Sequence, residues 1–175
     1  MQNALAPPQI RTPFGSCPLQ RENLVPKFCE VIPSTIEAME AVLTKALEVV
    51  KVLPCAPEEI EGIELALREA LANAILHGNQ NDSAKKVIVA GFCECENEGG
   101  LLLVVCDEGS GFDPAQVPNP TTAESIYSGH GRGIFLMGRL MDEVNYRNGG
   151  CEVELRKTSK EECLPEPPMS QPEQP

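Results

Sequence analysis

Apolar residues near the start of the chain change from strand-like to helical spacing. The first run, Leu24–Ile32, predicts a strand, and Pro26 favours an edge or bulged position for it because proline cannot donate a ladder hydrogen bond. Ser34 and Glu37 then have the spacing of a capping box. The apolar positions that follow at helical spacing are Ile36, Met39, Leu43, Ala46, Leu47 and Val50. The pattern therefore predicts an edge strand followed by a capped helix.

A second helix is predicted from about Pro57, which suits a first helical turn, to His77, with Gly78 ending it. Its core stripe consists of Ile60, Ile63, Leu67, Leu71 and Ala74. Glu69 and Asn73 are four residues apart, so they share one face roughly opposite that stripe. This polar pair predicts either a ligand-facing surface or simply a solvated helix face.

The rest of the pattern completes an α+β domain. The further predicted elements are strands Lys85–Cys95 and Leu101–Asp107, a helix over about 132–141, and a hairpin of Glu143–Arg147 with Cys151–Lys157. In the last strand apolar residues alternate with charged ones. The order βααββαββ predicts a two-layer α+β sandwich, with helices on one face of a mixed, mostly antiparallel sheet.

Composition separates this core from two tails. Residues 1–23 and 158–175 together hold 9 of the 16 prolines and little apolar surface, so both are predicted to be disordered. The single predicted domain is 24–157, and it keeps a net charge of -10 from 11 basic and 21 acidic residues.

Charge and hydropathy narrow the classes of partner. The net charge of -12 disfavours binding to nucleic acid or to an anionic membrane. No apolar run approaches the roughly 18 residues of a membrane span, so we expect a cytoplasmic protein. The 8 cysteines contain no C-x-x-C pair and are expected to be reduced thiols, with zinc or redox use as the alternative.

Two glycine-rich segments carry further candidate chemistry. Asp107 closes a buried strand and is followed by Gly109 and Gly111, an arrangement that places a carboxylate beside a closely approaching ligand, or else forms an ordinary turn. Three more glycines alternate where the third helix begins: Gly129, Gly131 and Gly133. Backbone amides at such a helix start can cradle phosphate, although flexible loops have similar sequences.

In chain order, the segments EALANAILHGN, DEGSGF and GHGRGIFLMGRLMDEV resemble the ATP-binding fold of gyrase, the large heat-shock chaperone, histidine kinases and mismatch-repair ATPases, the GHKL superfamily. Within it, the chain is similar to the small stand-alone anti-sigma regulatory kinases. The resemblance spans almost the whole predicted core and implies a Bergerat-type ATP-binding fold.

The resemblance also implies roles for single residues. Asn73 would coordinate Mg²⁺ on the ATP phosphates, Glu69 would be the general base, and Asp107 would accept a hydrogen bond from the adenine amino group. Gly109 and Gly111 would let the purine approach. The glycine box that would bind the phosphates contains Gly129, His130, Gly131, Arg132 and Gly133.

The implied function is that of an anti-sigma factor and ATP-dependent serine/threonine kinase, which phosphorylates a STAS-type antagonist. Residues 113–128 would form a lid over the nucleotide, and a homodimer is possible by the same resemblance. Tyr127 stands where some relatives carry an arginine that could reach the terminal phosphate. A non-catalytic ATP-binding switch that regulates a protein partner is therefore the alternative.

Overall fold

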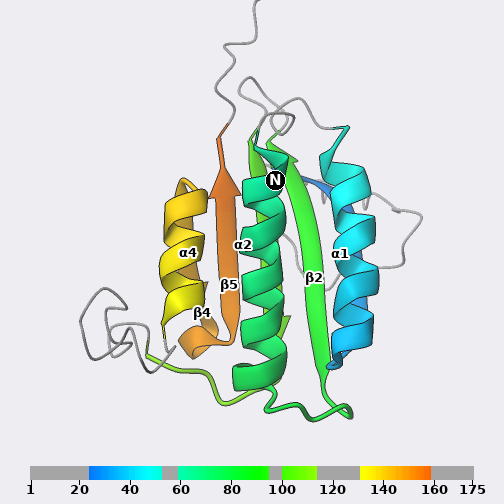
Figure 1. Ribbon diagram of the computed structural model, residues 1–175, viewed down its shortest axis with the longest axis vertical. Coiled ribbons are helices and arrows are strands. Elements are labelled where there is room, and N and C mark those ends of the chain that lie inside the picture. Colours follow the sequence, from blue (N-terminus) through cyan, green and yellow to red (C-terminus); the bar gives the residue numbers. More distant parts are fainter. Residues whose placement is uncertain (1–23, 53–58, 95–99, 114–130, 159–175) are drawn as a thin grey trace, which may run out of the picture.

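A computed structural model of the protein describes residues 24–52, 59–94, 100–113 and 131–158. These residues form one sheet with the helices packed against one of its faces (Figure 1). Nearly all of the predicted tails and of the predicted lid lies outside the described residues, so the domain boundaries and the lid stay predictions. No helix in the described ranges has the length and apolar character needed to cross a membrane.

The five described strands are β1 (Leu24–Pro33), β2 (Lys86–Glu94), β3 (Leu101–Asp107), β4 (Glu143–Arg147) and β5 (Glu152–Lys157). Their order in the sheet is β1-β2-β3-β5-β4, and every pairing among them is antiparallel. The predicted α+β sandwich is confirmed. As predicted, β1 is an edge strand, and its pairing with β2 shifts register between Pro26 and Phe28.

The described helices are α1 (Ile36–Val50), α2 (Ile60–Ala72) and α4 (Arg132–Leu140). The capping box predicted at Ser34 and Glu37 is not formed, because α1 is capped one residue later: Oγ1 of Thr35 accepts a hydrogen bond from the backbone N–H of Ala38 at 3.3 Å. The hydroxyl of Ser34 has no hydrogen-bond partner among the described residues. The predicted start of the second helix at Pro57 lies outside the described residues.

The last turn of the second helix differs from the prediction in its geometry. The helix continues to Gly78 as expected, but it widens into a π-helical segment, η1 (Asn73–Gly78). The N–H of Asn79 accordingly donates to the carbonyl of Ala74, five residues back, at 2.8 Å. Such wide turns are frequent at functional sites, and this one begins at Asn73.

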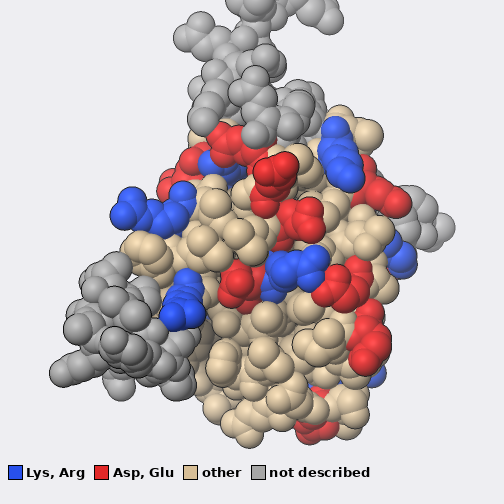
Figure 2. Space-filling view, viewed as in Figure 1, with Lys and Arg blue, Asp and Glu red and all other residues tan. Residues whose placement is uncertain are grey.

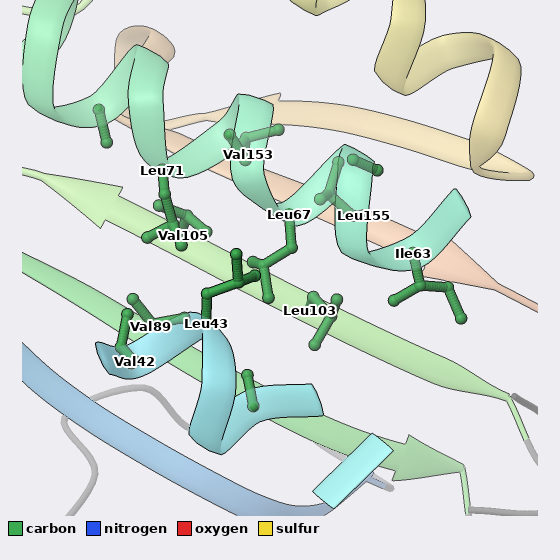
Figure 3. Close-up of a cluster of buried hydrophobic side chains, with 14 of the residues drawn as sticks. Val42, Leu43, Ile63, Leu67, Leu71, Val89, Leu103, Val105, Val153 and Leu155 are labelled. Carbon is green, nitrogen blue, oxygen red and sulfur yellow. The ribbon is translucent and has the colours of Figure 1, made fainter. Parts of the chain in front are cut away.

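The main core lies between the helices and the sheet (Figure 3). Leu67 and Leu71 of α2 point toward Leu103 and Val105 of β3, and Leu43 of α1 packs beside them. All five are at most 2% exposed, and each buried side chain of this size stabilises the fold by about 2 kcal/mol. The predicted core stripe is thereby confirmed along α2.

The acidic side chains of β5 are buried, although they alternate with apolar residues along the strand. Glu152 and Glu154 are only 4% and 5% exposed. Glu154 Oε2 pairs with Nε of Arg147 at 2.7 Å, and Glu152 Oε2 accepts from Nδ2 of Asn148 at 2.8 Å. Both carboxylates therefore find partners within the closing hairpin, which makes their burial tolerable.

Cys29 differs from the expectation of reduced thiols. Cys93, Cys106 and Cys151 are not part of a disulfide, whereas Cys29 is disulfide-bonded. Cys29 belongs to a second, smaller apolar cluster that includes Phe92 of β2. Sequence spacing could not reveal the bond, because a disulfide depends on which Cβ atoms the fold brings within about 4 Å.

Candidate functional site

A cavity of about 980 Å³ opens between the end of the second helix, the start of α4 and the end of β3. It has the size of sites that hold nucleotide-sized ligands. The predicted site residues that line it are Glu69, Asn73, Asp107, Gly111, Arg132, Gly131 and Gly133. Gly109 does not line it, and Gly129 and His130 lie outside the described residues.

Glu69 and Asn73 lie close against the start of α4 in the wall of this cavity. A Cβ atom built on Gly133 would stand 2.7 Å from Oε2 of Glu69 and 3.3 Å from Nδ2 of Asn73. Any larger residue at position 133 would therefore displace the carboxylate. The i, i+4 spacing brings the two side chains to one face, and the glycine lets the α4 backbone approach them.

The N-terminus of α4 presents backbone donors to the same space. Gly131 caps the helix with a φ of +80°, a left-handed conformation that favours glycine, and no side chain caps the helix at this end. The first amide groups of a helix lack intrahelical acceptors and carry partial positive charge. This end of the cavity therefore suits an anionic group such as phosphate.

Asp107 is held at the other end of the cavity, where β3 ends. Its Oδ1 accepts a hydrogen bond from the backbone N–H of Gly109 at 2.8 Å. Burial raises the pKa of Asp107, while the Gly109 hydrogen bond and the charge of Lys85 act in the opposite direction. The result is a partly buried hydrogen-bonding group in the cavity wall.

The glycines after Asp107 are also required by contacts within the protein. A Cβ atom on Gly109 would stand 2.7 Å from Oδ1 of Asp107 and would also collide with the carbonyl of Gly78. Gly111 has a φ of +73° and lies against the carbonyl of Gly149 in the hairpin turn. Contacts within the protein therefore require glycine at these two positions, whether or not a ligand also approaches them.

Sequence reasoning assigned no role to Asn79, which joins the end of the second helix to the sheet. Asn79 is fully buried. Its Nδ2 donates to the carbonyl of Lys86, and its Oδ1 accepts from the N–H of Glu108, each at 2.9 Å. It therefore fixes the position of Asp107 relative to the second helix. The sequence signals were its place directly after Gly78 and its position as the last residue of the segment EALANAILHGN.

Sequence reasoning also missed the wall that the closing hairpin contributes. Tyr146 and Cys151 line the cavity together with Phe112. The rings of Phe112 and Tyr146 meet edge to face, with centroids 5.2 Å apart. Burial raises the pKa of Tyr146 to about 12. The hairpin pattern predicted strands but carried no signal that they reach the site.

The residues present fit ATP and Mg²⁺. The cavity volume, the glycine cradle at Gly133 and the uncapped α4 N-terminus suit a nucleotide. The side-chain amide oxygen of Asn73 is a ligand type that hard divalent cations accept. Charged side chains gather over α1 and the first turns of α2, whereas the lower part of this face, around the end of α2, shows few (Figure 2).

Comparison with known proteins agrees with this geometry. The serine-protein kinase RsbW of Bacillus subtilis (strain 168) is 34% identical over 107 residues, which are 57% of this chain and 65% of the relative. The anti-sigma F factor of Geobacillus thermodenitrificans is 35% identical over 106 residues, 57% of this chain and 70% of the relative. The anti-sigma F factor of Clostridium perfringens is 32% identical over 107 residues, which are 57% of this chain and 73% of the relative.

The match to the RsbW kinase thus spans less than two thirds of that protein's length. A model of the histidine kinase-like ATPase domain matches residues 32–157, from the end of β1 through β5. This range includes every described residue of the cavity. The chain therefore belongs to the histidine kinase-like ATPase domain family, the GHKL type of ATP-binding fold, and is similar within it to the anti-sigma kinases.

Proposed function

We propose that this protein is an ATP-dependent serine/threonine kinase that also acts as an anti-sigma factor, in a bacterial partner-switching system. Its kinase substrate would be a serine or threonine hydroxyl on a STAS-type antagonist. The observation that carries the proposal is the close approach of Glu69 and Asn73 to Gly133 in the cavity wall. The names of the relatives, serine-protein kinase and anti-sigma F factor, support the same pair of roles.

In this proposal, the α4 N-terminus and its glycines hold the phosphates of ATP, while Asp107 binds the base. Asn73 holds Mg²⁺, which when bound neutralises charge on the phosphate oxygens. Glu69 takes the proton of the attacking hydroxyl as its oxygen bonds to the terminal phosphorus and ADP leaves. The chain supplies positioning and charge, as phosphoryl transfer requires.

The test is a single-turnover assay with labelled ATP, Mg²⁺ and each STAS-domain protein of the native host. Wild type should transfer label to one of them, and Glu69→Gln should transfer it about 10² to 10⁴ times more slowly while still binding Mg-ATP. Transfer by Glu69→Gln at the wild-type rate would show that Glu69 is not the base. Glu64→Gln, on the same helix but outside the cavity lining, is the matched control.

The same assay separates the kinase from the second candidate, a non-catalytic switch. The sequence feature that favours the switch is Tyr127, in the place where some relatives have arginine. Tight Mg-ATP binding by wild type, with no labelled protein from any of the STAS-domain candidates, would favour the switch. The ATP-dependent binding of a sigma factor would then be measured directly.

A further inference from the structure

Tyr146 carries a polar atom that the proposed kinase mechanism does not use. Its hydroxyl oxygen is buried, and the structure gives it no hydrogen-bond partner within the described residues. Native proteins rarely leave a buried hydroxyl unpaired, because removing it from water without a replacement partner is unfavourable. An unpaired group in a cavity wall indicates a partner that arrives with a ligand.

The ring of Tyr146 is held firmly in this wall. It packs edge to face on Phe112, with an interplanar angle of 75°, and Tyr146 pairs with Val153 across the hairpin. Gly150 keeps Phe112 in place, since a Cβ atom there would stand 2.7 Å from the Phe112 nitrogen. Burial raises the pKa of Tyr146 to about 12, so the phenol keeps its proton near neutral pH and remains a donor.

Tyr146 lies toward the end of β3 in the register of the sheet, because it pairs with Val153, which pairs with Val105, two residues before Asp107. The backbone N–H of Asp107 donates to the carbonyl of Cys151 at 2.9 Å, and Sγ of Cys151 lies 3.3 Å from the carbonyl oxygen of Gly109. The hairpin that carries Tyr146 is therefore tied to the end of β3, where Asp107 lies. Glu69 and Asn73 face the start of α4 instead.

We propose that Tyr146 is a specificity-determining residue, whose hydroxyl donates a hydrogen bond to an acceptor atom on the nucleoside part of the bound nucleotide. This inference rests on the proposed function, since it takes the cavity to be an ATP site. Tyr146 acts with Asp107: the carboxylate accepts from the base and the phenol donates to an acceptor nearby. A ligand without that acceptor leaves the hydroxyl unpaired and binds more weakly.

The chain offers a matched control for this proposal. Ser34 also has a buried hydroxyl with no partner among the described residues, but it does not line the cavity. Tyr146→Phe and Ser34→Ala each remove one such hydroxyl and little else. Neither should lower the melting temperature, because neither breaks a hydrogen bond of the ligand-free protein.

Calorimetry with Mg-ATP and with Mg-ADP on the full chain tests the proposal. Tyr146→Phe should lower the affinity for both ligands by the same factor of about five, which corresponds to the loss of one neutral hydrogen bond. Ser34→Ala should bind both like wild type. Equal affinities of wild type and Tyr146→Phe would overturn the inference and leave the ATP site intact, whereas no heat with wild type would overturn the proposed function itself.

Two further outcomes would also contradict the role of Tyr146. A loss seen with ATP but not with ADP would place the contact at the terminal phosphate. A melting temperature of Tyr146→Phe well below that of wild type would show that the hydroxyl already has a partner in the ligand-free protein.

Discussion

The carboxylate of Asp107 lies directly against the backbone of Gly78. A Cβ atom built on Gly78 would stand 2.6 Å from Oδ1 of Asp107, closer than a methyl group and an oxygen can approach. The end of the second helix and the end of β3 are thus in contact at the proposed base-binding residue. The identity of residue 78 therefore bears on ligand binding as well as on helix termination.

Gly78→Ala should weaken ATP binding by tenfold or more, because the added methyl group moves the carboxylate that is proposed to bind the base. Calorimetry with Mg-ATP measures this loss. Gly138→Ala is the control: its Cβ would meet no atom within 4 Å, and alanine in a helix should stabilise the protein by about 0.5–1 kcal/mol. Equal ATP affinity of Gly78→Ala and wild type would contradict the prediction.

Asp107→Asn should lose at least about tenfold in ATP affinity, because an amide cannot replace the carboxylate acceptor in both of its contacts. The stability of the variant, unlike its ATP affinity, should not fall. Burial raises the pKa of Asp107 above 3.8, so its contribution to stability is present below that pH and is lost as the pH rises through the folded-state value. Because asparagine has no charge to desolvate, the variant should be at least as stable as wild type at pH 7.

Urea denaturation at pH 7 and near pH 3.5 checks this sign. Any stability advantage of Asp107→Asn should vanish at the lower pH, where the carboxyl is largely protonated in both states. A variant that is clearly less stable than wild type at pH 7 would show that the ionised carboxylate stabilises the fold.

Lys157→Met should destabilise the protein by about 2 kcal/mol, because it removes a buried cation that pairs with the partly buried Glu59 and with Asp142. Lys157 is 6% exposed, and its Nζ pairs with Glu59, with Oδ1 of Asp142 at 3.2 Å and with the carbonyl of Leu140 at 3.0 Å. Lys45→Met is the control: its ion pair with Glu30 is exposed and should matter by less than about 0.5 kcal/mol.

The same variant should change the pH dependence of stability. Burial raises the pKa of Asp142, but hydrogen bonds from Thr158 and Lys157 outweigh burial, so the pKa lies below 3.8. The stability that Asp142 contributes is therefore present above pH 3.8 and is lost as the pH falls through the folded-state value. Part of this loss should be absent in Lys157→Met, which acid titrations followed by circular dichroism can measure.

Thr35→Ala should cost about 1 kcal/mol, because it removes the hydroxyl that accepts from the N–H of Ala38 at the start of α1. Thr44→Ala, in the middle of the same helix and exposed, should be neutral or slightly stabilising. Urea denaturation compares the two variants. Equal midpoints would show that the cap contributes nothing to stability.

Local chemistry determined most of the fold. The strand and helix order, the bulge near Pro26 and the shared face of Glu69 and Asn73 depend on spacings of a few residues, so the sequence alone could predict them. The cap of α1 was predicted one residue too early, because Ser34 and Thr35 are both residue types that favour the cap position. The glycine-containing segments likewise indicate the family without knowledge of tertiary contacts. These features depend on short stretches of chain whose steric and hydrogen-bonding preferences are nearly independent of the rest.

The tertiary structure decided what the site is made of. Two features of the site join segments that are distant in the sequence: the contact between Gly78 and Asp107, and the placement of Tyr146 in the cavity wall. The π-helical turn that begins at Asn73 leads directly into the first of these contacts. The burial of Glu152 is of the same kind, since its partners are Cys106 of β3 and Asn148 of the hairpin turn. Side-chain pairing and burial follow from which surfaces meet when the layers pack, and a one-dimensional pattern does not contain that information.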